Sequence, residues 1–183
     1  MVNALVVHCH PCADSLGAAA RDAVLDGLRA GGGTAQLIDL YASGFSARAD
    51  DAVVRQHISM LRSCELLILV YPTWWAAQPA MLRSWFEQGW LRHSFGPVST
   101  GRGTAEHFVN IRRLVVVTTH GSPKWINAVQ GESGKHFLQR RVRRTLHPRA
   151  RVEWLALYGL DHEKPGDTER FLTRIRDRFA RIG

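Results

Sequence analysis

The sequence predicts an α/β fold in which helices cover both faces of an open parallel sheet. Short apolar runs alternate with amphipathic helical segments five times along the chain, as in a doubly wound sheet. The most hydrophobic run, Leu66 to Tyr71, lacks the alternation of a half-buried strand and is typical of a central strand buried on both faces. No internal repeat or low-complexity linker interrupts the 183 residues, so we expect a single domain over residues 1–183.

Each element is predicted from its hydrophobic period and its flanking residues. Apolar runs of strand length give the expected strands Asn3–His8, Gln36–Leu40, Leu66–Tyr71, Leu114–Thr118 and Val152–Tyr158. Apolar residues at helical spacing give the expected helices Ser15–Ala30, Asp51–Ser63, Pro79 to Phe86 or Leu91, Gly134–Leu146 and Pro165–Ile182. Asp14 or Ser15 can cap the first helix. The region Ser94 to His107 contains three glycines and one proline, and we expect it to be a loop.

Composition excludes several classes of protein. With 45% hydrophobic and 22% charged residues, the chain has the composition of a globular protein and not of a disordered, collagen-like or disulfide-stapled one. The longest nearly apolar stretch, Leu66 to Ala77, is shorter than the roughly 20 residues that span a bilayer, so no transmembrane segment is expected. Three cysteines without a framework spacing, and an N-terminus without signal-peptide features, predict a cytoplasmic protein.

The net charge of +8 is concentrated in the second half of the chain. Residues 1–99 carry 7 basic and 8 acidic side chains, whereas residues 100–183 carry 17 basic and 8 acidic ones. The densest basic run contains Arg140, Arg141, Arg143, Arg144, Arg149 and Arg151. Arginine recognises phosphate and carboxylate in a bidentate manner, so nucleic acid, a membrane surface or a phosphorylated cofactor are possible partners. A solvated helix face explains the same run without any partner.

Three loops are expected to form a ligand site. In a doubly wound sheet, ligands bind outside the carboxyl ends of the strands, where the strand order reverses. For the order 2-1-3-4-5 that point lies between the first and third strands. The loops that meet there are His8 to Ser15, Tyr71 to Gln78 and Thr118 to Lys124.

The first loop leads from a strand into a helix N-terminus. Free backbone N–H groups and the helix dipole favour an anion such as phosphate there, and the hydroxyl of Ser15 can add a donor. His8, Cys9 and His10 are of the residue types that bind zinc, but alternation puts Cys9 on the opposite side and no second ligand cluster follows, so no metal is expected. A capped turn without a ligand is the third interpretation, which Asp14 favours because its carboxylate would repel phosphate.

The second and third loops have the composition of a site for a planar heterocycle. Trp74 and Trp75 are adjacent and cannot both be buried behind the edge of a sheet, so at least one should offer a face or edge to a planar ligand. The alternative is that Trp75 and Trp85 simply pack against the following helix. Hydroxyls, backbone amides and the imidazole of His120 in the third loop suit the polar edge of a heterocycle, or else form a hydrogen-bonded turn.

Several stretches resemble the NAD(P)H:quinone oxidoreductases of the flavodoxin-like fold, in the same order and over nearly the whole chain. They are His10-Pro11, Ser15 at a helix start, Asp39-Leu40-Tyr41, Gly44-Phe45, Tyr71-Pro72-Thr73-Trp74-Trp75, Pro79-Ala80-Met81-Leu82-Arg83-Ser84-Trp85-Phe86 and Thr118-Thr119-His120-Gly121-Ser122. The resemblance implies a flavodoxin-like three-layer sandwich, with a five-stranded parallel sheet in the order 2-1-3-4-5 and helices on both faces. It also implies an NAD(P)H dehydrogenase (quinone)-like flavoprotein, in which flavin passes hydride from NAD(P)H to a quinone or similar acceptor. A homodimer is expected, because the family is generally dimeric.

The same resemblance implies which residues bind the flavin. By the family pattern, the flavin phosphate is bound by His10, Ser15, Leu16 and Gly17, the ring system by Pro72, Thr73, Trp74 and Trp75, and the pyrimidine edge by Thr118, Thr119, His120, Gly121 and Ser122. FMN is expected over FAD, because the chain is short and shows no separate adenosine-binding segment. The flavin carries the chemistry, so no obligatory catalytic side chain is assigned.

The sequence departs from the family pattern in the first and third loops. Family members commonly have Asn at the position of Gly17 and Gly at the position of His120, so His120 would be strained if its backbone needed a positive φ. Asn127 and Ser133 stand where mammalian members have a Tyr and a His, so a proton relay through that pair is not expected. His120 could instead stabilise negative charge on the reduced flavin.

Two functions of other classes compete with the reductase. A similar fold serves as the cytoplasmic ancillary subunit of glutathione-gated potassium efflux systems, and a regulatory flavoprotein of that kind could dock through the Arg140–Arg151 run. A nucleic-acid-binding module would use the same arginines, but no recognised nucleic-acid motif accompanies them, so no nucleic-acid partner is expected.

Overall fold

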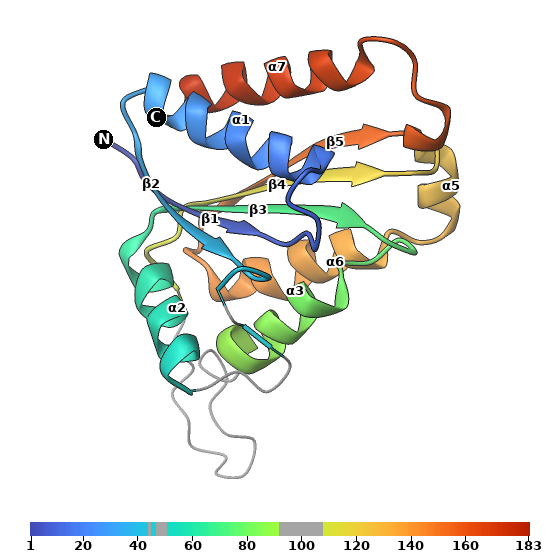
Figure 1. Ribbon diagram of the computed structural model, residues 1–183. Helices are drawn as coiled ribbons and strands as arrows, with labels where there is room; N and C mark the ends of the chain where they lie inside the picture. The colour runs from blue at the N-terminus through green and yellow to red at the C-terminus, as the bar shows by residue number, and fades with distance from the viewer. Residues whose placement is uncertain (44, 47–50, 92–107) are drawn as a thin grey trace.

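The computed structural model describes residues 1–43, 45–46, 51–91 and 108–183. Its centre is a five-stranded parallel sheet in the order β2-β1-β3-β4-β5 (Figure 1). The strands are β1 (Asn3–His8), β2 (Thr34–Asp39), β3 (Leu66–Thr73), β4 (Arg113–His120) and β5 (Arg151–Tyr158). The expected fold class and strand order are therefore confirmed.

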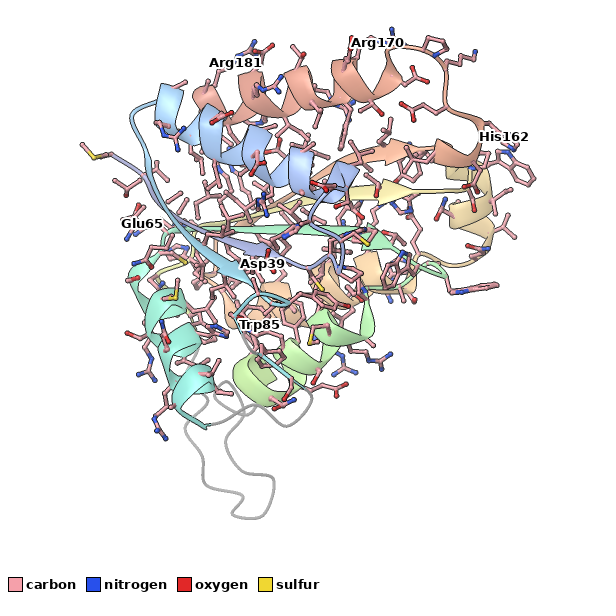
Figure 2. All side chains as sticks on the ribbon, in the orientation of Figure 1. Asp39, Glu65, Trp85, His162, Arg170 and Arg181 are labelled. Carbon is pink, nitrogen blue, oxygen red and sulfur yellow. The ribbon has the colours of Figure 1, made fainter. Side chains whose placement is uncertain are left out.

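Helices cover both faces of the sheet. Helix α1 (Leu16–Ala30) and helix α7 (Asp167–Ala180) lie on one face, and α2 (Asp51–Ser63), α3 (Ala80–Trp85) and α6 (Ser133–Arg140) lie on the other (Figure 1). Helix α5 (Lys124–Val129) lies beyond the carboxyl ends of the strands. A π-helical segment η1 (Phe86–Leu91) continues α3, and short 3₁₀ segments η2 (Val142–Thr145) and η3 (Leu160–His162) flank β5. Arg170 and Arg181 lie on the outward face of α7 (Figure 2).

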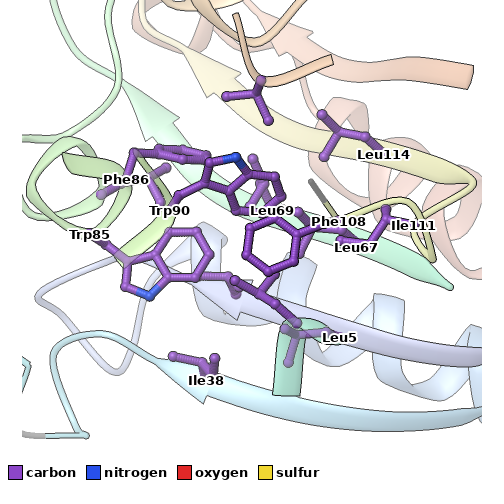
Figure 3. Packing of buried hydrophobic residues seen from close by; sticks show 14 of the residues in the cluster. Leu5, Ile38, Leu67, Leu69, Trp85, Phe86, Trp90, Phe108, Ile111 and Leu114 are labelled. Atoms are coloured by element: carbon purple, nitrogen blue, oxygen red, sulfur yellow. The ribbon is translucent and has the colours of Figure 1, made fainter. Parts of the chain in front are cut away.

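Alternation along the strands divides the apolar side chains between two cores. In β1, Leu5 and Val7 face the α2/α3/α6 side, whereas Ala4 and Val6 face the α1/α7 side, and all four are fully buried. This two-sided burial explains the continuous apolar runs of the sequence. The aromatic rings of Trp85, Phe86, Trp90 and Phe108 pack together between η1 and the sheet, with 4.5 Å between the Trp90 and Phe108 ring centroids (Figure 3).

The outer edge of β5 is bounded by α7. Strand β5 is the last of the sheet, and its residues are half-buried, apart from the exposed Arg151. Arg174 donates to the backbone oxygen of Ala156 at 3.0 Å, and Arg178 makes two 2.6 Å hydrogen bonds to the carboxylate of Glu153. Two arginines of α7 therefore hold this edge strand.

Several element boundaries differ from the prediction. Strand β4 continues through Thr119 and His120, because these side chains are buried and their backbone pairs with β5. The expected helix Gly134–Leu146 is two segments, α6 and η2. In η2 the hydroxyl of Thr145 donates to the carbonyl of Val142 and accepts from Nε1 of Trp90 (2.7 and 2.8 Å), and this tight turn buries Thr145. Helix α5 was not predicted, because six residues carry too little periodicity. Strand β2 begins at Thr34 and not at Gln36.

The expected loop Ser94–His107 and Gly44 lie outside the described residues. Within the described ranges, no helix combines the length and the apolar content needed to cross a bilayer.

Candidate functional site

The N-terminus of α1 is a candidate anion site. Ser15 caps the helix, and its hydroxyl oxygen accepts from the backbone N–H of Ala18 at 3.1 Å. The N–H groups of Leu16 and Gly17 open the helix and have no acceptor within it. A Cβ added to Gly17 would lie 3.4 Å from Cδ2 of His10, so the His10 ring lies against this turn. The structure thus brings together the four residues that were expected to bind phosphate.

The buried His8 pairs with the half-buried Asp39 next to this loop. The register pairs His8 with Asp39 at the ends of β1 and β2, and His8 Nδ1 lies 2.9 Å from Asp39 Oδ2 (Asp39 is labelled in Figure 2). Burial lowers the pKa of His8, although the Asp39 carboxylate acts in the opposite direction. Burial also acts to raise the pKa of Asp39, but hydrogen bonds from His8 and from the Ala42 and Tyr41 amides leave that pKa below its usual value. The sequence analysis did not find this pair; only the register of β1 and β2 reveals it.

No metal cluster forms at this loop. Cys9 is buried and Cys12 is exposed, and His8 is engaged by Asp39. Among the residues that the structure describes, no three His, Cys, Asp or Glu side chains are grouped as metal ligands would be.

The chain reverses after β3 in a tight, left-handed turn. The backbones of Trp74 and Ala77 exchange two hydrogen bonds, of 3.1 and 3.0 Å. Trp75 and Ala76 between them both have positive φ, 50° and 59°, which is the conformation of a type I′ turn. Such φ values are costly for residues with a side chain and mark sites where the surrounding structure imposes them.

Hydrogen bonds from the first turn of helix α6 hold this turn in its conformation. The carbonyl of Ala76 accepts from the Gly134 N–H (3.1 Å) and the Ser133 hydroxyl (3.2 Å), and Nε2 of Gln78 donates to the Gly134 carbonyl at 2.7 Å. The result is that Trp75 is 93% exposed and Trp74 is 45% exposed. The interpretation that Trp75 packs against the following helix is therefore wrong, whereas Trp85 is a core residue.

The third segment lies at the carboxyl end of β4. Thr118 and Thr119 are buried in the strand, and the Thr118 hydroxyl lies 2.8 Å from that of Thr73. Beyond the strand, Gly121 leaves room for Asp161, because a Cβ there would lie 2.8 Å from the Asp161 carboxylate oxygens. The exposed side chain of Asp161 in η3 therefore lies close over Gly121.

His120 is a strand residue with a buried side chain. It is not among the described residues with positive φ, so the strain considered for a His at this position does not arise. Its Nδ1 lies 2.9 Å from Oδ1 of Asn127, and its ring stacks on Tyr158 with a centroid distance of 4.3 Å. Burial lowers the pKa of His120, and its hydrogen bond to Asn127 acts against that shift.

An open pocket of about 310 Å³ lies between the second and third loops. It is lined by Thr73, Trp74, Trp75, Ala76, Gly121, Ser122, Asn127 and Gln130. Five of these were expected site residues. Ala76, Asn127 and Gln130 were not, because the turn geometry and α5 could not be predicted.

The remaining expected residues lie elsewhere. Pro72, Thr118 and Thr119 lie in the strands behind the open pocket, and His120 faces a separate cavity. His10, Ser15, Leu16 and Gly17 form the α1 site and do not line the open pocket. Arg149 and Arg151 of the basic run lie at the amino end of β5, at the opposite end of the strand from Tyr158 and the third loop.

The fold and the site together define a doubly wound α/β protein with a binding pocket at the carboxyl ends of its strands. The chain belongs to the family described as having the flavodoxin-like fold, whose profile matches residues 2–178. No curated protein matches the sequence.

Solved structures share the fold at low sequence identity. An NAD(P)H:quinone oxidoreductase from Methanothermobacter marburgensis superposes with a TM-score of 0.78 at 19% identity, over 99% of this chain and 96% of that one. A putative quinone reductase from Klebsiella pneumoniae gives a TM-score of 0.80 at 19% identity, over 100% and 85% of the two chains. An FMN-dependent NADH-azoreductase from Bacillus anthracis, solved in complex with FMN, gives 0.66 at 15% identity, over 100% and 99%.

Proposed function

We propose that this protein is a flavin-dependent NAD(P)H oxidoreductase of the quinone reductase type, with FMN as its cofactor. The observation that carries the proposal is the turn at Trp74–Ala77, which holds Trp75 exposed beside Gly121 and Ser122 in one open pocket. An exposed indole next to backbone amides and a hydroxyl suits a planar heterocycle with one polar edge. The three similar structures named above are all described as reductases or oxidoreductases.

The residues present fit FMN. The open pocket has the size of a small-molecule site, and Trp74 and Trp75, which can pack against a ring system, are part of its lining. The N-terminus of α1, with its free Leu16 and Gly17 N–H groups, suits the phosphate. No side chain at Gly17 obstructs the approach of an anion. We include a homodimer and a single domain in the proposal, on the family resemblance alone.

In this proposal the residues of the protein bind and orient the cofactor, and the cofactor supplies the redox chemistry. A bound flavin would supply the chemistry of hydride transfer between NADH or NADPH and a quinone or a similar acceptor. Asn127 and Gln130 line the pocket beside Ser122 and can direct the polar edge of the ring. The hydrogen bonds from Ser133 and Gly134 hold the backbone of the turn that carries the exposed Trp75 indole.

The test is a visible spectrum of the purified protein after loading with FMN and desalting, taken before and after anaerobic NADH or NADPH. We expect a retained flavin band that one of the nucleotides bleaches and a quinone restores. Trp75→Ala should weaken FMN binding by about tenfold or more, equivalent to about 1.4 kcal/mol, because a ring-stacking face is lost. Trp125→Ala is the matched control, since Trp125 is also exposed but lies outside the pocket lining.

The outcomes separate the competing functions. A retained band that neither nucleotide bleaches would favour a regulatory flavoprotein docking through the Arg140–Arg151 run. Absence of retained FMN or FAD would refute the flavoprotein proposal and leave the fold alone.

A further inference from the structure

A second cavity lies directly behind the wall of the open pocket. This cavity, here called the His120 cavity, leaves about 10 Å³ for the centre of a water molecule, which is room for about one water. It is lined by Tyr71, Thr73, Ala76, Ala77, His120, Asn127, Glu132, Gly134, Lys135 and Trp154. Thr73, Ala76 and Asn127 line both spaces. A group in the His120 cavity is therefore separated from the open pocket by a single layer of residues.

Three buried polar atoms around this cavity have no hydrogen-bond partner among the described residues. They are the Tyr71 hydroxyl, Nε2 of His120 and Nε1 of Trp154. Tyr71 and His120 are only 2% and 5% exposed. Polar neighbours are present, Gln78 for Tyr71 and Tyr158 for Trp154, but neither forms a hydrogen bond of acceptable geometry. Buried polar groups are nearly always satisfied, so three orphans on one cavity point to a polar occupant.

The hydrogen bonds of Asn127 determine the tautomer of His120. Nδ2 of Asn127 donates to the carbonyls of Ser122 (3.1 Å) and Pro123 (3.0 Å), which leaves Oδ1 facing Nδ1 of His120 at 2.9 Å. Since Oδ1 can only accept, Nδ1 of His120 carries a proton. In a neutral imidazole Nε2 is then an unprotonated acceptor.

The three orphan atoms match the hydrogen-bonding capacity of one water molecule. Nε2 of His120 accepts, Nε1–H of Trp154 donates, and the Tyr71 hydroxyl does either. We propose that the His120 cavity is a buried proton-uptake site: one water molecule bridges His120, Tyr71 and Trp154, and His120 takes up a proton from solvent when negative charge enters the open pocket.

This arrangement satisfies both protonation states of His120. With neutral His120, the water donates to Nε2 and accepts from Trp154. With the imidazolium, the water accepts from both Nε2–H and Trp154 Nε1–H and donates to the Tyr71 oxygen. The hydroxyl of Tyr71 is what permits the reversal, since it changes from donor to acceptor. In either state the water is a hydrogen-bond partner to each of the three orphan atoms.

The charges around His120 leave it neutral in the free protein. Glu132 and Lys135 form an ion pair of 2.8 Å on the cavity wall, and their effects on the pKa of His120 are opposite. Tyr71 and Tyr158 are the other ionisable groups against the ring, and burial raises the pKa of each, so both stay neutral. Burial then keeps His120 uncharged until an anion arrives to compensate the imidazolium. In the proposed function, on which this step rests, flavin reduction supplies that negative charge.

The experiment is histidine ¹⁵N NMR on the full-length protein, with His120 assigned through His120→Gln. In the free protein at about pH 7 we expect the Nδ1–H tautomer, with a ¹⁵N shift for Nε2 that shows an accepted hydrogen bond. Tyr71→Phe should move that shift toward the value of a free lone pair and lower the pH at which His120 titrates. In the FMN-loaded protein, reduction by dithionite at the same pH should protonate Nε2. His57 is the internal control, because it is buried outside the cavity and its Nδ1 accepts from Trp85.

Two results would overturn the proposal. An Nε2 shift that is identical in the parent protein and in Tyr71→Phe would refute the bridging water, whether or not flavin binds. A neutral His120 in the reduced, FMN-loaded protein would refute the proton uptake. Failure to retain FMN would contradict the proposed function, and the water bridge would still be decided by the measurements on the free protein.

Discussion

His8 and His120 occupy equivalent places in two strands, but His8 has a charged hydrogen-bond partner and His120 a neutral one. Each is the last residue of a parallel strand, β1 or β4, and they are 1% and 5% exposed. His8 lies 2.9 Å from the carboxylate of Asp39, whereas His120 lies 2.9 Å from the neutral amide of Asn127. Burial lowers the pKa of both rings. A buried histidine therefore has a charged group beside it to compensate an imidazolium only where its partner is a carboxylate, and the depth of burial does not decide this.

The backbone around the two histidines differs as well. The described non-glycine residues with positive φ are Trp75, Ala76 and Glu132, and all three lie around the open pocket or the His120 cavity. The first loop, beside His8, has none among them. Among these residues, backbone strain is therefore found around the open pocket and the His120 cavity and not beside His8. Strained backbone of this kind is common at functional sites.

The largest expected effect is on the His8 side. Asp39→Ala removes the partner of a buried imidazole. It also removes the carboxylate oxygen that accepts from the backbone N–H groups of Tyr41 and Ala42. We expect a loss of about 2–4 kcal/mol in the free energy of unfolding, measured by urea denaturation. Asp26→Ala is the matched control, because Asp26 pairs with Arg29 on the exposed surface of α1 and should change stability by less than about 0.5 kcal/mol. Equal effects of the two substitutions would contradict the assigned role of Asp39.

The corresponding substitution on the His120 side should cost less, because no charge loses its partner. Asn127→Ala removes the acceptor of His120 Nδ1 and the two donors to the Ser122 and Pro123 carbonyls. We expect a loss of about 1–3 kcal/mol in unfolding free energy. Gln130→Ala, a change at an exposed residue of the same pocket wall, should be close to neutral. A larger loss of unfolding free energy for Asn127→Ala than for Asp39→Ala would contradict the expected order.

The pH dependence of stability should show the buried histidines directly. The pKa values of His8, His57 and His120 are lowered from 6.5 in the folded state, so the unfolded state binds their protons first. Stability is therefore fully present above about pH 6.5 and falls as the pH drops below it, by up to about 1.4 kcal/mol per pH unit for each histidine. Asp39, whose pKa is lowered from 3.8, adds a second loss below that pH. Urea midpoints measured from pH 8 to pH 3 test both losses, and a flat profile through pH 6 would contradict the first.

The smallest expected effect concerns the strained turn. Ala76→Gly places the residue that tolerates positive φ at a position with φ of 59°, and should raise stability by about 0.5–1 kcal/mol. Ala128→Gly, within α5, is a control in ordinary helical backbone and should lower stability by about as much. Thermal denaturation of both variants measures the difference. If Ala76→Gly proved destabilising, the turn would not be strained.

The sequence predicted the layers and the strand order but not the contacts that cross between elements. Apolar runs and helical periods are local, and they located all five strands and the main helices. The pairing of His8 with Asp39 depends on the register of two strands, which no local pattern encodes. Asn127 was visible only as a departure from a family pattern, and its contact with His120 depends on α5, a helix of six residues. Trp75 was expected near a ligand from composition, yet its exposure follows from two positive φ angles.

The contacts between α7 and β5 have a consequence for how the protein behaves at high concentration. The last strand of an open sheet presents unpaired backbone groups that a strand from another molecule can use. Arg174 already occupies the carbonyl of Ala156, and Arg178 with Glu153 adds charge to the same stretch. An incoming strand would have to displace a guanidinium and come close to fixed charges. The helix that covers one face of the sheet thus also protects its edge from edge-to-edge aggregation.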